Sequence, residues 1–142
     1  MIEGGVICVD FDGRRYRVVR SVSTWRVDDS YNRVELSTGV ALDYVARTVR
    51  EALENLIGSR ATPSLLTQAV SRTDSVLREL SRPEPAGMGL LAGDANNPAF
   101  RNITASIDGD VLSVSFECSP IIPLNYGLVT VKATPHSGSV SL

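Results

Sequence analysis

Two Asp-Gly pairs, one near each end of the chain, each separate two runs of β-forming residues, and they constrain the fold more than any other feature. Such a pair favours a two-residue type I′ turn, because both central positions of that turn need φ above zero. The first pair, Asp12-Gly13, predicts a hairpin with strands at residues 6–11 and 14–19. We expect the returning strand to continue to Trp25, before the polar residues that follow it.

The second pair, Asp108-Gly109, predicts a hairpin in the last third of the chain. Residues 103–107 and 112–118 alternate apolar and polar side chains, so one face of each strand should be buried and the other should face water. A further apolar run predicts a last strand at residues 124–131.

An apolar stripe at spacings of three and four residues predicts a helix between the two hairpins. Its members are Leu42, Val45, Val49, Leu53 and Leu56. Ser37 or Thr38 is expected to cap its start, and Gly58 to end it. The charged residues outside the stripe, which should face water or a partner, are Arg47, Arg50, Glu51 and Glu54.

A second helix is predicted to begin at Thr62-Pro63, where Thr serves as N-cap and Pro occupies the first helical position. Its apolar stripe consists of Leu66, Ala69 or Val70, Thr73, Val76 or Leu77, and Leu80. A long Gly- and Pro-rich loop follows, up to Pro98. The element order predicts an α+β fold with a mainly antiparallel sheet, built from the N-terminal hairpin and three C-terminal strands, and two helices packed on one face.

The composition is that of a soluble globular protein of one domain, with 142 residues, 43% hydrophobic and 21% charged. No apolar run approaches the roughly 18 residues that span a bilayer. The first residues lack the basic and apolar regions of a signal peptide. We therefore expect no membrane partner, and assembly in a cytoplasm.

The sequence contains few residues that could support catalysis. His136 is the single histidine and lies in a polar tail, and the two cysteines, Cys8 and Cys118, have no metal or redox spacing. Both are expected to be buried as small apolar residues, with a disulfide as the alternative. The paired aspartates lie at the Asp-Gly turns, where turn chemistry explains them. We predict no catalytic residue, no metal site and no cofactor, and hence no enzyme.

Five arginines cluster in and after the first hairpin: Arg14, Arg15, Arg17, Arg20 and Arg26. One interpretation is a charged edge strand that discourages unwanted pairing. Another is a docking site for an acidic protein partner. The net charge of −2 argues against a third, a nucleic-acid site.

Several stretches of the chain resemble one family. Residues 108–116 and 118–126 resemble the closing strands of contractile tail sheath proteins, found in phages and related injection systems. Residues 17–24 resemble the strand, rich in arginine and ending in threonine, that opens the C-terminal domain of that family. Residues 42–45 and 57–60 fit its first helix in order. The resemblance covers about residues 14–133, through strand and turn chemistry and not through one signature motif.

The resemblance implies a structural subunit that assembles with copies of itself around an inner tube. Subunits of such sheaths are linked by extended arms that add strands to neighbouring sheets, where main-chain hydrogen bonds give cohesion. On this interpretation residues 1–133 form the domain and residues 134–142 the arm. The implied arm contacts are Thr134, Pro135, Ser139, Val140 and Leu142. The candidates to face the tube or another partner are Arg47, Arg50, Arg15 and Arg17.

The implied partners are further copies, the inner tail tube protein and baseplate proteins, in a virion tail assembled in the host cytoplasm. Sheath proteins usually carry further domains before this one, so the resemblance also implies a fragment, a processed chain or a small relative. Two alternatives stay open. One is a tail component outside the sheath, such as a terminator or baseplate adaptor, and the other is an arginine-hairpin module that binds nucleic acid.

Overall fold

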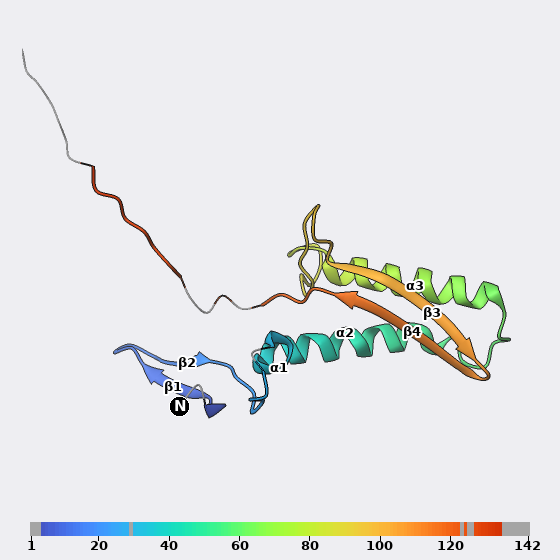
Figure 1. The fold of residues 1–142 in the computed structure, drawn as a ribbon, viewed down its shortest axis with the longest axis horizontal. Coiled ribbons are helices and arrows are strands. Elements are labelled where there is room, and N and C mark those ends of the chain that lie inside the picture. The colour runs from blue at the N-terminus through green and yellow to red at the C-terminus, as the bar shows by residue number, and fades with distance from the viewer. Residues whose placement is uncertain (1–3, 29, 123, 125–126, 135–142) are drawn as a thin grey trace, which may run out of the picture.

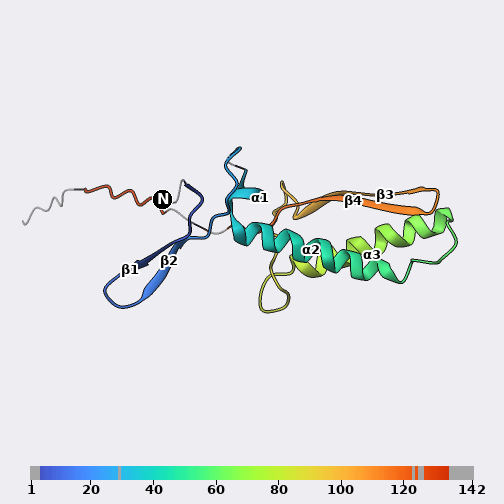
Figure 2. The same cartoon turned by 90° about the horizontal axis from the view of Figure 1, so that it is seen from below.

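The computed structural model describes residues 4–28, 30–122, 124 and 127–134. Its elements are β1 (Cys8–Phe11), β2 (Tyr16–Arg20), α1 (Tyr31–Val34), α2 (Leu36–Glu54), α3 (Pro63–Ser81), β3 (Phe100–Asp108) and β4 (Val111–Cys118). Helices α2 and α3 lie side by side, and the β3–β4 hairpin forms a second layer over them (Figures 1 and 2). The β1–β2 hairpin projects from the end of the molecule where α2 begins. The predicted α+β class with antiparallel pairing is confirmed.

Helix α2 begins earlier than its sequence predicts. Its N-cap is Glu35, which has extended backbone angles (φ −86°, ψ 118°) and forms an antiparallel bridge with Val22. The predicted caps lie inside the first turn of the helix, and Thr38 is fully buried there. The prediction of Ser37 or Thr38 as N-cap was therefore wrong, because a bridge to a distant segment fixes where the helix starts.

Helix α3 follows the sequence closely. Thr62 is its N-cap in an extended conformation, and Pro63 occupies the first turn. The side chains that it buries are Leu65, Ala69, Thr73, Leu77 and Leu80. The buried Thr73 hydroxyl donates to the carbonyl of Ala69, so this polar residue is satisfied within the helix. Leu65, rather than the predicted Leu66, begins the buried stripe.

Both hairpins turn at glycine. Gly13 has φ of 85° and Gly109 has φ of 61°, whereas Asn102 is the one non-glycine residue with positive φ in the described ranges. The residue after each glycine therefore does not have the positive φ that type I′ requires. Glycine at the first central position is the pattern of type II′, so the hairpins were predicted correctly but with the wrong turn type.

The core lies between the helices and the inner face of β3–β4. One buried cluster contains Val45, Val49, Leu77, Leu80 and Leu91, with Phe100 and Phe116 of the hairpin packed against it. A second contains Leu56, Leu65 and Ala69, with Leu112 and Val114 packed against it. The strict alternation of half-buried and exposed residues along β4 supplies these inward side chains.

The sheet differs from the sequence prediction in two respects. The two hairpins form separate two-stranded sheets and not one continuous sheet. No strand is formed by Leu124 or by residues 127–131, which the sequence analysis assigned to a last strand. Leu124, Leu128, Val129 and Val131 are 84–96% exposed. The segment has the composition of a strand but has no partner edge among the described residues, and a strand needs a hydrogen-bonded neighbour.

Candidate subunit interface

One edge of β4 is open. Its other edge pairs with β3 in an antiparallel ladder from Phe100–Cys118 to Asp108–Val111, with an irregularity between Arg101 and Thr104. Among the described residues no strand pairs with the second edge. A row of main-chain donors and acceptors is therefore available to an added strand.

An apolar groove of about 860 Å³ lies beside this open edge. Val49 and Leu53 of α2, with Leu56 just after the helix, line one wall, and inward side chains of β4 line the other. The β4 side chains are Leu112, Val114 and Phe116. A strand added to β4 would cover this groove, so the main-chain edge and the apolar surface lie in the same place.

The second uncovered surface is the segment at residues 127–134, which follows the layered body of the protein. Residues 127–134 are extended, carry no strand pairing and are exposed at every position. Figure 1 shows this segment running away from the layered body. Its most exposed apolar side chains are Leu128 (96%), Val131 (85%) and Val129 (84%). Among the described residues, the chain therefore presents an extended apolar segment without a pairing partner and, separately, an unpaired edge of β4.

The β1–β2 hairpin is apolar on one face. Val9 lies opposite Val18, and Phe11 lies opposite Tyr16, so these four side chains share that face. All four are 53–77% exposed, and the Phe11 and Tyr16 rings have centroids 4.9 Å apart. Large exposed apolar faces on a two-stranded ribbon mark a surface that binds another molecule.

The other face of the hairpin and its tip are charged. Arg17 contacts Asp10 across the strands at 3.9 Å, with both side chains more than half exposed. The Asp12 carboxylate accepts hydrogen bonds from the main-chain N–H groups of Arg14 and Arg15, each at 3.1 Å. Both arginines are exposed at the tip of the ribbon.

The root of the hairpin is held firmly to α2. The Arg20 guanidinium contacts the fully buried Glu35 carboxylate, with Nε and Nη2 at 2.6 and 2.5 Å from Oε1. The main chain adds two hydrogen bonds, from the Ser23 N–H to the Val34 carbonyl and from the Leu36 N–H to the Ser21 carbonyl. These contacts therefore fix the base of the hairpin to the start of α2, so the hairpin is not a free terminal arm.

The structure separates the candidate residues predicted from sequence. Arg15 and Arg17 lie in the projecting hairpin, whereas Arg47 and Arg50 are exposed on α2. Only Arg50 lines the groove. In the predicted arm, Thr134 is exposed, and Pro135, Ser139, Val140 and Leu142 lie outside the described residues.

The groove itself was missed by the sequence analysis. Two signals pointed to it: the alternation along residues 112–116, and the end of the apolar stripe at Leu53 and Leu56. Neither signal indicates which edge of the sheet stays open. The prediction from sequence also placed residues 124–131 on that sheet as a further strand.

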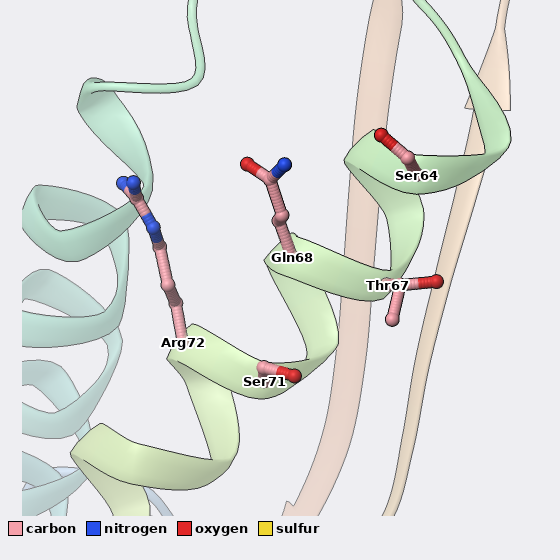
Figure 3. Close-up of a pocket in the computed structure, with 5 residues that line it drawn as sticks. All are labelled: Ser64, Thr67, Gln68, Ser71 and Arg72. Atoms are coloured by element: carbon pink, nitrogen blue, oxygen red, sulfur yellow. The ribbon is translucent and has the colours of Figure 1, made fainter.

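A second, open depression of about 570 Å³ runs along α3 and is lined by polar and charged residues. Figure 3 shows the side chains that line it: Ser64, Thr67, Gln68, Ser71 and Arg72. Arg72 extends toward α2, where its Nη1 donates to the Ala52 carbonyl at 3.3 Å. These residues include no carboxylate, imidazole or thiol, so this surface lacks a general base for hydrolytic chemistry.

The titratable groups with shifted pKa values serve local structure. A hydrogen bond from the Asn102 amide, and then Arg101 at 2.7 Å, lower the pKa of Glu117 on the outer face of β4. Partial burial raises the pKa of the Cys118 thiol. Cys8 and Cys118 are both free and half-buried, so the disulfide alternative is not realised. Across residues 4–28, 30–122, 124 and 127–134, no three His, Cys, Asp or Glu side chains are grouped as metal ligands require.

Comparison with known proteins adds no relative: no protein-family model matches the chain, and no curated protein matches it at a significant level. Among the described residues, no helix has the length and apolar character needed to cross a membrane. The function must therefore be argued from the open edge, the groove and the uncovered segments.

Proposed function

We propose that this chain is a structural subunit of a contractile tail sheath, which joins copies of itself by β-strand addition. The observation that carries the proposal is the combination of an unpaired β4 edge above an apolar groove with an unpaired apolar segment at residues 127–134. An extended segment from one copy would complete the edge of the next. The sequence resemblance to sheath proteins over residues 14–133 supports the assignment to that assembly.

Strand addition accounts for both uncovered surfaces at once. Main-chain hydrogen bonds along β4 would supply affinity, and alternate side chains of the added strand would enter the groove. Successive side chains of an extended segment point to opposite faces, so Leu128 lies on one face and Val129 and Val131 lie on the other. We place the joining element in the stretch beginning at Gly127, ahead of the predicted arm at residues 134–142, because no described strand pairs with this stretch.

The remaining parts of the proposal follow from the assembly. The inner tail tube protein and baseplate proteins would be the further partners, and the site of action would be the virion tail after assembly in the host cytoplasm. The chain acts by cohesion and not by catalysis.

The test is to remove the main-chain donors of the joining segment. Proline at Leu128 and Val129 removes two successive N–H groups, one of which would face β4 in either register. The matched control, Leu128→Ala with Val129→Ala, retains both N–H groups. We expect concentration-dependent association of the wild-type protein in sedimentation velocity, a weaker association of the alanine variant, and a monomeric proline variant.

Two outcomes would contradict the proposal. The wild-type chain could stay monomeric at high concentration, or the proline variant could associate as well as the wild type. Electron micrographs of the assembled protein separate the alternatives, since tubes or helical arrays support a sheath and closed rings support a terminator or adaptor.

A further inference from the structure

The two ends of the molecule carry opposite charge. The β1–β2 hairpin lies at one end and the β3–β4 turn at the other (Figures 1 and 2). Arg14 and Arg15 are exposed at the hairpin tip, and Asp108 and Asp110 are exposed at the β3–β4 turn. Asp10 pairs with Arg17, and the tip itself carries Arg14 and Arg15 against the single carboxylate of Asp12, so its net charge is positive.

Both ends also expose large apolar side chains beside those charges. At the hairpin, Phe11 is 53% and Tyr16 is 77% exposed. At the turn end, Val111 is 56% and Ile57 is 81% exposed, and both line the outer end of the groove together with Asp110. Arg60, exposed in the loop between the helices, adds a cation to this end, and Glu54 at the end of α2 adds a further carboxylate.

A single copy cannot bring these ends together. The hairpin is fixed to the start of α2 through Arg20 and Glu35, whereas Ile57 follows the end of that helix. Helix α2 has 19 residues, so the two points are separated by roughly 28 Å along a rigid rod. The hairpin projects away from the helix and from the turn end (Figure 1).

We propose that the hairpin of one copy docks on the β3–β4 turn end of a second copy. Phe11 and Tyr16 would cover Ile57 and Val111, while Arg14 and Arg15 face the two aspartates of the turn. The inference rests on the proposed function, since it requires that copies associate. It uses side chains at the turn end of the groove, whereas strand addition uses the main chain of β4 and the part of the groove beside Leu112, Val114 and Phe116.

The contact is heterologous, because each copy contributes a different surface to it. Heterologous contacts between identical copies propagate in one direction and generate rings or helical filaments. Strand addition from residues 127–134 of one copy onto β4 of the next is heterologous too, so the hairpin would supply a second directional contact between copies.

The test uses reversal of charge at each end. The hairpin-reversed variant carries Arg14→Asp and Arg15→Asp, the turn-reversed variant carries Asp108→Lys and Asp110→Lys, and the combined variant carries all four. The control, Arg78→Asp with Arg82→Asp, changes the charge of two exposed arginines on and just after α3, away from the hairpin and the β3–β4 turn. Far-UV circular dichroism establishes that each variant folds, and sedimentation velocity measures association.

We expect each reversed variant alone to associate at least about tenfold more weakly than the wild type, because like charges then meet at the contact. The combined variant should recover wild-type association, and so should an equimolar mixture of the two reversed variants. Recovery in the combined variant would exclude pairing of hairpin with hairpin. In that arrangement the hairpin-reversed and combined variants would bring the same like charges together and would associate equally weakly. The control should associate as the wild type does.

Other outcomes overturn the inference. A combined variant as weak as the hairpin-reversed one would mean that the arginines face another surface, and reversed variants that associate normally would mean that the ends do not meet. If reversal has no effect but the proline variant at residues 128 and 129 is monomeric, only this inference fails. If the wild-type chain never associates, the proposed function fails with it.

Discussion

Arg20 and Glu35 form the contact that mounts the N-terminal hairpin on the body of the protein. The Glu35 side chain is fully buried, and Arg20 Nε lies 2.6 Å from its Oε1. Arg20 ends β2, and Glu35 caps α2, so the contact joins two segments whose backbones also form a bridge at Val22.

Removing the cation should destabilise the fold strongly. Arg20→Ala leaves a carboxylate in a buried position, and breaking a buried ion pair from one side costs about 3–5 kcal/mol. The matched control is Arg17→Ala, whose partner Asp10 is 3.9 Å away and exposed, with an expected cost of less than about 1 kcal/mol. Urea unfolding of both variants measures the difference. Equal losses of unfolding free energy in the two variants would show that the Arg20–Glu35 contact stabilises the fold no more than an exposed ion pair does.

The second prediction concerns the core beneath the groove. Leu77 is fully buried between α2 and the β3–β4 hairpin, so Leu77→Ala should lower the free energy of unfolding by about 3–5 kcal/mol through lost burial and a cavity. Leu77 and Leu66 both belong to α3, but Leu66 is only half-buried, so Leu66→Ala should lower the free energy of unfolding by about 1 kcal/mol. Chemical denaturation reports both values. A larger loss at Leu66 would contradict the assignment of the buried face of α3.

Acid should weaken the outer face of the β3–β4 hairpin through Glu117. The Asn102 amide and Arg101 lower its folded-state pKa, so the folded protein favours the charged form more than the unfolded chain does. This contribution to stability is complete above the ordinary glutamate pKa of about 4.3 and is lost as the pH falls below it, through the lowered folded pKa. Glu117→Gln should therefore be less stable than the wild type at pH 7, with a smaller difference at pH 3. Urea unfolding across this range tests the trend, with Glu51→Gln, an exposed carboxylate on α2, as control.

A fourth prediction concerns the loop that leads into β3. A Cβ added at Gly93 would lie 2.2 Å from the backbone nitrogen of Ala99, so the backbone itself must move to admit any side chain. Gly93→Ala should cost about 1–3 kcal/mol, as overpacking does elsewhere. At Gly4 nothing lies within 4 Å of an added Cβ, and Gly4→Ala should leave thermal unfolding unchanged. A neutral result at Gly93 would show that the approach to Ala99 is not required by the fold.

Local sequence signals predicted most elements because their causes are local. Glycine tolerates the positive φ of a tight turn, which placed both hairpins at Gly13 and Gly109. The helical spacing of apolar residues and the Thr62-Pro63 start predicted α3 to within a residue. These preferences depend on neighbours a few residues away, so they can be read without a structure.

The sequence could not predict how the elements combine. The start of α2 is set by the bridge between Glu35 and Val22, thirteen residues apart in the sequence and joined only in the folded chain. Residues 127–131 have a pattern typical of a strand, yet no strand in the described part of the chain pairs with them. Strand pairing is a contact between distant segments, and the period of the pattern does not say which edge a strand joins.

The candidate interface likewise has one part that the sequence predicts and another that only the folded structure shows. By itself the sequence determined that the chain holds two hairpins, two amphipathic helices and an apolar C-terminal run, because turn chemistry and hydrophobic period are local properties. Only the tertiary structure decided that the edge of β4 stays open beside Leu53 and Phe116, and that opposite charges lie at the two ends of the molecule. Which surfaces remain uncovered depends on how all the elements pack together, and no single segment contains that information.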